Sequence, residues 1–106
     1  NWEASSIDEW KTYLRARAYE NALFVAGVNR VGEDVTMSFG GESMVVGPRG
    51  QIYASMADET DAETGAPLEG FTVARIDLDA VRRSREEYQF IQNRQPPIYR
   101  AIVRKY

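Results

Sequence analysis

Four polar side chains are the residues of this 106-residue chain whose types and spacing could do chemistry. Arg17 and Glu20 are three positions apart, so on a helix they share a face and can form an ion pair. Asn29 ends an apolar run, where a side-chain amide must find hydrogen-bond partners. Ser43 acts as a nucleophile only beside a base, and the chain offers it no histidine and no obvious lysine. We therefore interpret all four as residues that support a site.

The chain contains no cysteine and no histidine. Without cysteine it has no disulfide, no thiolate metal ligand and no thiol nucleophile. Without histidine it lacks the usual general base near neutral pH. A Ser-His-Asp triad, a zinc finger and an H-E-x-x-H protease site are excluded within this chain, and no apolar run approaches the roughly 20 residues of a transmembrane helix.

An acidic cluster lies between residues 56 and 70, a segment without any basic residue. A calcium loop of the EF-hand type needs a central glycine and a closing glutamate, and this spacing lacks both. We interpret the segment as a solvated surface loop. The cluster consists of Asp58, Glu59, Asp61, Glu63 and Glu69.

The charge of the chain is uneven. The net charge is −3, but residues 82–106 carry seven basic and two acidic side chains, which is +5 and leaves −8 on the rest. No stacking aromatics are interleaved with these arginines, which argues against a nucleic-acid partner. The basic segment is more typical of a helix end or of a surface that docks on an acidic partner.

Two helices are predicted. The first spans residues 6–23, because Ser6 and Glu9 have the spacing of a capping box and apolar residues recur on one face. These apolar residues are Ile7, Trp10, Leu14 and Ala18. The second spans about residues 80–93, is capped by Asp77 or Asp79, and is ended by the two prolines of 95–97.

Four strands complete the predicted order. Residues 24–29 have the apolar density of a buried strand, and residues 31–41 are expected to form a loop. Residues 43–46 and 51–55 predict a hairpin around the Gly-Pro-Arg-Gly turn of 47–50, where Arg49 is expected to matter little. Residues 71–78 alternate as a half-buried strand does, and residues 98–106 form a short tail. The pattern predicts an α/β (α+β layered) fold with about four strands and two helices.

Several motifs in sequence resemble the carbon–nitrogen hydrolases of the nitrilase superfamily. The run 15–21 (RARAYEN), followed by Phe-Val at 24–25 and Asn-Arg-Val-Gly at 29–32, is similar to that family's R-A-x-E-N…F-V…N-R-x-G. Residues 39–43 (FGGES) and 48–50 (PRG) match its F-x-G-x-S…P-x-G stretch. Further similar pieces are Asn1-Trp2, 74–78 (ARIDL), Arg85 and 94–99 (RQPPIY).

The resemblance implies the C-terminal part of an α-β-β-α sandwich, with residues 1–106 as the C-terminal segment of a single hydrolase domain. The family's catalytic glutamate, lysine and cysteine lie upstream of the part that begins with Asn-Trp, so no residue of this chain is expected to be catalytic. Asn1 and Trp2 are the expected substrate-binding residues. The expected supporting residues are Arg17, Glu20, Asn29 and Ser43.

The predicted function is the C-terminal portion of a cytoplasmic carbon–nitrogen hydrolase, with an amidase favoured. Nitrilase and N-carbamoyl amidohydrolase chemistry stay open, as does a non-catalytic binding or scaffold domain, or a chain that completes a site on a partner. The chain begins with Asn1, which indicates processing or a piece of a longer protein. The expected partners are the upstream part of the enzyme, a small amide or nitrile substrate and further copies, without nucleic acid or membrane. No metal or organic cofactor is implied.

Overall fold

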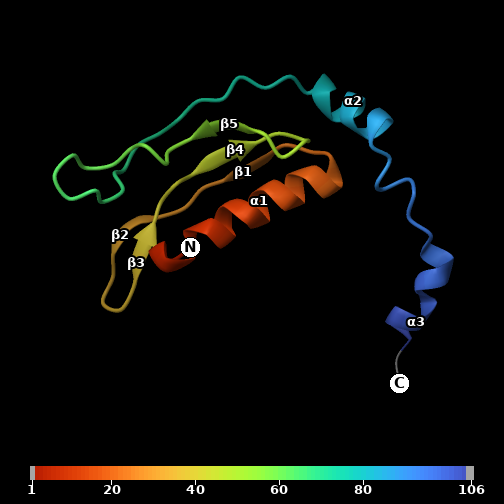
Figure 1. Cartoon of the computed structure of the whole chain (residues 1–106), viewed down its shortest axis with the longest axis horizontal. Coiled ribbons are helices and arrows are strands. Elements are labelled where there is room, and N and C mark those ends of the chain that lie inside the picture. The colour runs from red at the N-terminus through yellow and green to blue at the C-terminus, as the bar shows by residue number, and fades with distance from the viewer. Residues whose placement is uncertain (1, 105–106) are drawn as a thin grey trace.

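The computed structural model describes residues 2–104 as one helix laid along a small antiparallel sheet, with a long C-terminal extension (Figure 1). A 3₁₀ turn at Ala4–Ser6 leads into helix α1 (Ile7–Asn21). The described strands are β1 (Val25–Gly27), β2 (Val31–Glu33), β3 (Ser38–Gly40), β4 (Met44–Val46) and β5 (Ile52–Ser55). Helix α2 (Asp79–Glu87), a 3₁₀ turn at Pro96–Tyr99 and helix α3 (Arg100–Val103) follow. Residues 2–104 therefore form a mixed α/β fold with three helices and five short strands, where two helices and about four strands were predicted.

The core lies between α1 and a three-stranded sheet of order β1-β4-β5. The predicted apolar face of α1 is confirmed, because Trp10 and Ala18 are buried against Met44 and Val46, with Ile7 and Leu14 packed beside them. The helix comes close to β1 at Gly27. A Cβ atom there would lie 2.8 Å from Cζ2 of Trp10 and would also collide with Leu14, so glycine permits this close packing.

The start of α1 corrects the predicted capping box. The side chain of Ser6 makes no capping hydrogen bond, because the chain enters α1 through a 3₁₀ turn in which the Ser6 N–H donates to the carbonyl of Glu3 (3.0 Å). The helix ends as left-handed caps do. Ala22 takes a φ of 47°, and its N–H donates to the carbonyls of Ala18 and Tyr19.

The predicted hairpin of β4 and β5 is confirmed. In its turn the Gly50 N–H donates to the Gly47 carbonyl (2.9 Å), and Gly50 has a φ of 76°. The predicted loop of residues 31–41 is wrong, because β2 and β3 pair as a second antiparallel hairpin. A bridge between Glu3 and Phe39 adds the N-terminal residues to its edge.

The predicted strand of residues 71–78 is also corrected. This segment runs extended outside β5 (Figure 1), but it pairs with no strand among the described residues. Phe71 is 88% exposed and Val73 81% exposed. A strand needs a hydrogen-bonded neighbour, and residues 2–104 do not supply one here. Residues 56–70 form the predicted surface loop.

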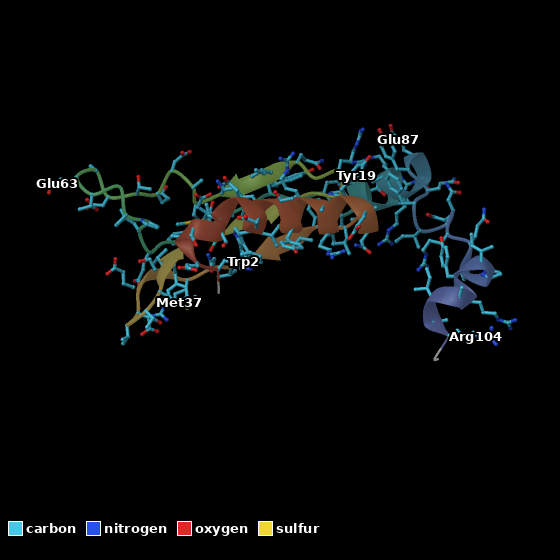
Figure 2. All side chains as sticks on the ribbon, turned by 60° about the horizontal axis from the view of Figure 1, so that its bottom comes forward. Trp2, Tyr19, Met37, Glu63, Glu87 and Arg104 are labelled. Carbon is cyan, nitrogen blue, oxygen red and sulfur yellow. The ribbon has the colours of Figure 1, made fainter. Side chains whose placement is uncertain are left out.

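Helix α2 is shorter than predicted and ends at Glu87 instead of Asn93. Tyr88 leaves the helical conformation (φ −120°, ψ 95°), and this turns its ring onto Tyr19 at a centroid distance of 6.2 Å. Phe90 packs edge-on against Tyr19 at 5.3 Å. Tyr19 and Glu87 accordingly lie at the same end of the molecule, with Glu63 far away at the other end (Figure 2).

Only one face of the sheet carries a helix among the described residues (Figure 1). Met44 and Val46 face α1, so Val45 between them faces the opposite way. Val45 is in register with Ala26 on β1 and Ala54 on β5, and none of the three is buried. In residues 2–104, α1 therefore covers one face of the β1-β4-β5 sheet, and the α-β-β-α sandwich of the whole domain stays a prediction.

Candidate functional site

Asn29 organises the end of the sheet where β1 finishes. Its side chain is buried, with the residue 9% exposed. The Trp2 N–H donates to its Oδ1 (2.8 Å), and its Nδ2 donates to the carbonyls of Gly41 (2.9 Å) and Trp2 (3.3 Å). One carboxamide therefore joins the N-terminal segment to the chain before β4, which meets the requirement that a buried amide be fully hydrogen-bonded.

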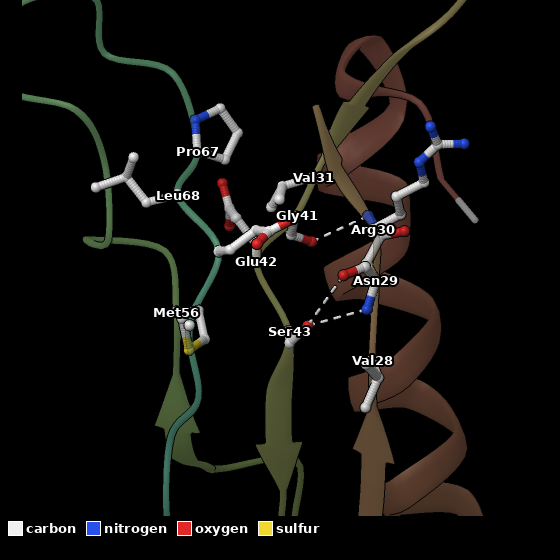
Figure 3. A pocket seen from close by; sticks show the side chains of 12 residues that line it. Val28, Asn29, Arg30, Val31, Gly41, Glu42, Ser43, Met56, Pro67 and Leu68 are labelled. Carbon is white, nitrogen blue, oxygen red and sulfur yellow. Dashed lines mark hydrogen bonds between the residues drawn. The ribbon is translucent and has the colours of Figure 1, made fainter. Parts of the chain in front are cut away.

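Ser43 lies beside Asn29 and is hydrogen-bonded to its backbone (Figure 3). The Asn29 N–H donates to Ser43 Oγ (2.9 Å), and Ser43 Oγ donates to the Asn29 carbonyl (3.4 Å). The hydroxyl thus uses both its donor and an acceptor position on the backbone. This geometry suits a structural hydrogen-bonding role better than nucleophilic attack.

Glu42 lies between Gly41 and Ser43, which both contact Asn29, and it interacts with two residues of helix α1. The indole N–H of Trp10 donates to the Glu42 carbonyl (3.2 Å), and Lys11 Nζ lies 2.5 Å from Glu42 Oε2. Neither contact was predicted. The partners are more than 30 positions apart in the sequence, and no periodicity or motif spacing signals such a pair.

A pocket of about 680 Å³ opens beside Asn29, Glu42 and Ser43 (Figure 3). Its walls come from the segment after β1, the segment before β4, and the end of the acidic loop. Polar and apolar side chains both line the pocket, and a few polar groups among apolar ones can orient a small molecule. The apolar part of the lining consists of Val28, Val31, Met56, Pro67 and Leu68.

Trp2 joins this site through its backbone rather than its ring. Its indole packs against Trp10 and Tyr13, with ring centroids 6.1 and 5.6 Å away, and it does not line the pocket beside Asn29. Its carbonyl also accepts from the Gly40 N–H (3.3 Å). Asn1, predicted with Trp2 as a substrate-binding residue, lies outside the described residues.

Arg17 and Glu20 lie elsewhere. They form the ion pair that their spacing predicts, on α1, with side chains 62% and 50% exposed. They border a shallow groove along α1 with Tyr13 and Ala16 and take no part in the pocket beside Asn29. The structure therefore brings together Trp2, Asn29 and Ser43 but places Arg17 and Glu20 apart from them.

The described side chains suit positioning more than bond-making chemistry. Residues 2–104 hold no group of three or more acidic side chains arranged as a metal site. In the acidic loop, Asp61 Oδ1 accepts from the backbone N–H groups of Glu63 (3.0 Å) and Thr64 (2.8 Å). That carboxylate shapes its own turn. No helix in the described part of the chain is long and apolar enough to span a bilayer.

Comparison with known proteins decides the family. The sequence model of the carbon–nitrogen hydrolases matches residues 1–86. This chain belongs to the carbon–nitrogen hydrolase family. The match begins at Asn1 and includes the Asn29 site, the pocket segments of 41–43 and 67–70, and most of α2. The predicted membership of the nitrilase superfamily is confirmed.

Relatives of this carbon–nitrogen hydrolase chain are nitrilases and amidases. It is 33% identical to a probable nitrilase of Schizosaccharomyces pombe over 97% of its own length and 35% of that protein. It is 36% identical to an omega-amidase of Escherichia coli (strain K12) over 83% of its length and 32% of that protein. The crystal structure of a carbon–nitrogen hydrolase from Helicobacter pylori G27 superposes with a TM-score of 0.78 and 25% identity, over 96% of this chain and 34% of that one. The chain thus spans about a third of the length of these relatives.

Proposed function

We propose that this chain is the C-terminal portion of an enzyme that hydrolyses carbon–nitrogen bonds, and that it supplies one wall of the substrate pocket. The observation that carries the proposal is the Asn29 site, where one buried side chain fixes Trp2 and Gly41 beside an open pocket. Asn29 lies two residues beyond the end of β1.

The bond-breaking groups come from the rest of the enzyme in this proposal. The chain has no cysteine, so a thiol nucleophile for the amide carbon is supplied by upstream residues, with a carboxylate to move the proton and an ammonium group to stabilise the developing oxyanion. Trp2 and Asn1 stay the predicted substrate-binding residues. Asn29 fixes the backbone of Trp2 and of Gly41, and Ser43 fixes the backbone of Asn29.

The sheet face opposite α1 supports a larger domain. Ala26, Val45 and Ala54 form an apolar cross-strand row that is not buried. Exposed apolar surface of this kind is stable when another layer covers it. We assign this face to contact with a second sheet, formed by the upstream part of the same enzyme.

An amide is the favoured substrate. The omega-amidase of Escherichia coli is 36% identical to this chain, whereas the relative from Schizosaccharomyces pombe is a probable nitrilase at 33% identity. Both reactions end in a carboxylic acid and ammonia, but they differ in the starting compound, because a nitrile consumes two waters on its way to the acid and an amide consumes one. Parallel assays of an aliphatic amide and the matching nitrile, with the ammonia released measured, distinguish them.

The proposal is tested by Asn29→Ala in the complete enzyme. We expect kcat/KM for the amide to fall by about tenfold or more, because the pocket segments lose their common anchor. The matched control is Asn21→Ala, since the hydrogen bond that its amide donates to the carbonyl of Arg17 (3.0 Å) is exposed and stays within one turn of α1. Equal kcat/KM values for both variants would contradict the proposal that Asn29 shapes the substrate pocket.

The complete enzyme is further proposed to be a homo-oligomer. Residues 91–104 are exposed throughout, including Ile98 at 68%, Ile102 at 82% and Val103 at 76%. Such a basic and apolar extension is suited to a contact between copies. Light scattering coupled to size exclusion, with residues 91–106 present or deleted, tests this assignment, and deletion is expected to lower the mass to that of a monomer.

A further inference from the structure

Glu42 has a backbone conformation that its residue type rarely adopts. Its φ is 53°, in the left-handed region where a Cβ atom is crowded and glycine is favoured. Gly41 before it has a φ of 62°, so glycine already occurs in this turn. A glutamate at the next position therefore indicates that its side chain has a task that outweighs the conformational cost.

Two consecutive residues of α1 hold Glu42. Trp10, itself 8% exposed, donates its indole N–H to the Glu42 carbonyl (3.2 Å). The Lys11 ammonium lies 2.5 Å from Oε2, which is the carboxylate oxygen shut off from solvent. The side chains of Lys11 and Glu42 are 33% and 20% exposed, so this pair is less screened by water than the other ion pairs of the described chain.

The residues on either side of Glu42 make the contacts of the Asn29 site. The Gly41 carbonyl accepts from Asn29 Nδ2 (2.9 Å), and Ser43 Oγ accepts from the Asn29 N–H (2.9 Å). Glu42 also lines the pocket. Because Gly41 and Ser43 adjoin Glu42 directly, a change in the backbone conformation of Glu42 moves both neighbouring contacts together.

We propose that Lys11 and Glu42 are positioning residues of the pocket, and that their ion pair holds the Gly41–Ser43 turn in the form that Asn29 binds. The expected effect on the substrate rests on the proposed function. The effect on the turn does not, because Lys11, Glu42 and Asn29 all belong to this chain. The ion pair connects α1 to the pocket through Glu42. In this proposal it affects the substrate only by holding the Gly41–Ser43 turn in place.

The experiment uses the complete enzyme with Glu42→Gln, Lys11→Met and Glu42→Gly. Glutamine keeps the shape of the side chain without its charge, and glycine removes the side chain while relieving the backbone. The first readout is the indole N–H signal of Trp10 in ¹H–¹⁵N spectra, assigned by its loss in a Trp10→Phe variant. The second is KM and kcat for the amide. The charge-reversed pair, Lys11→Glu with Glu42→Lys, tests rescue, and Arg82→Met removes an exposed arginine ion pair on α2 as control.

We expect the three single variants to shift the Trp10 indole signal and to lower kcat/KM by about tenfold to a hundredfold, with partial recovery in the charge-reversed pair and no change in Arg82→Met. An unchanged indole signal in Glu42→Gln, or Glu42→Gly with the kinetics of the parent, would overturn the inference. If the complete protein hydrolyses no amide, the proposed function fails, and the indole signal alone still decides whether the pair holds the turn.

Discussion

The side-chain amide of Asn29 forms hydrogen bonds with both backbone polar groups of Trp2. Oδ1 accepts from the Trp2 N–H at 2.8 Å, and Nδ2 donates to the Trp2 carbonyl at 3.3 Å. This pairing resembles one rung of a β-ladder made by a side chain. It holds the N-terminal segment at the end of β1, although 27 positions separate the two residues.

Asn29→Asp tests this pairing without a change of size. Aspartate keeps the acceptor for the Trp2 N–H but loses the donor to the carbonyls of Trp2 and Gly41, and it places a carboxylate against two carbonyl oxygens. We expect the free energy of unfolding to fall by about 3 kcal/mol, measured by urea denaturation. The control is Asn21→Asp at the end of α1, where the amide makes an exposed hydrogen bond within the helix, and a loss of equal size there would contradict the special role of Asn29.

Gly27→Ala tests the close approach of α1 to β1. The added methyl group meets the ring of Trp10 at 2.8 Å and the end of Leu14, so the helix or the side chains must shift. We expect a loss of about 1–3 kcal/mol in unfolding free energy. Gly65→Ala is a control without crowding, because a Cβ at Gly65 meets no atom within 4 Å and any loss there comes from its φ of 70°, which alanine rarely adopts. If Gly27→Ala costs no more than this control, the packing at β1 is looser than described.

Arg49→Ala tests the attachment of the C-terminal extension, and that Arg49 matters little for substrate turnover stays a prediction. Its guanidinium lies 4.8 Å from the ring centroid of Tyr88, and Nη2 donates to the Tyr88 hydroxyl at 2.5 Å. We expect a loss of about 1 kcal/mol and faster hydrogen exchange at the amides of residues 84–90. Arg85→Ala, on helix α2 just before Tyr88, serves as control. Identical hydrogen exchange in both variants would count against the contact between Arg49 and Tyr88.

The charged residues of α2 predict an acid-sensitive helix. Hydrogen bonds from Arg83 and Arg82 hold the pKa values of the Asp77 and Asp79 carboxyls, respectively, below the ordinary range. Because these folded-state values lie below the unfolded value of about 3.9, the stabilisation is complete above that pH and is lost as the pH falls through the folded-state pKa. Carboxyl ¹³C titration of Asp79 should give a midpoint below 3.9 that rises in Arg82→Met and in high salt. A midpoint unaffected by both would contradict the pairing.

The sequence predicted local features better than long-range ones. The buried face of α1 was predictable because its apolar residues recur at helical spacing, and the β4–β5 turn because Gly50 permits a positive φ. The β2–β3 hairpin was missed because each strand has three residues and includes a glycine, too short for alternation to show. Residues 71–78 alternate like a strand, yet pairing depends on a neighbour that no local pattern reveals.

The site was predictable in part for a related reason. Asn29 and Ser43 were singled out because a polar residue beside an apolar run needs partners, but their mutual contact was not foreseen. Lys11 and Glu42 were missed because their attraction depends on where α1 lies over the sheet. Arg17 and Glu20 do pair as their spacing predicts, but spacing within a helix does not determine which side of the helix faces the pocket.

The most direct test of the central claim is amide hydrolysis by this chain combined with the separately produced upstream two-thirds of the enzyme, followed as ammonia release. The account predicts no turnover by either part alone, turnover by the mixture, and loss of that turnover on treatment with a thiol-blocking reagent, because the nucleophile lies upstream. Turnover by the isolated chain that resists the reagent would contradict the account. So would a mixture in which the two parts associate, as shown by light scattering, and hydrolyse neither amide nor nitrile.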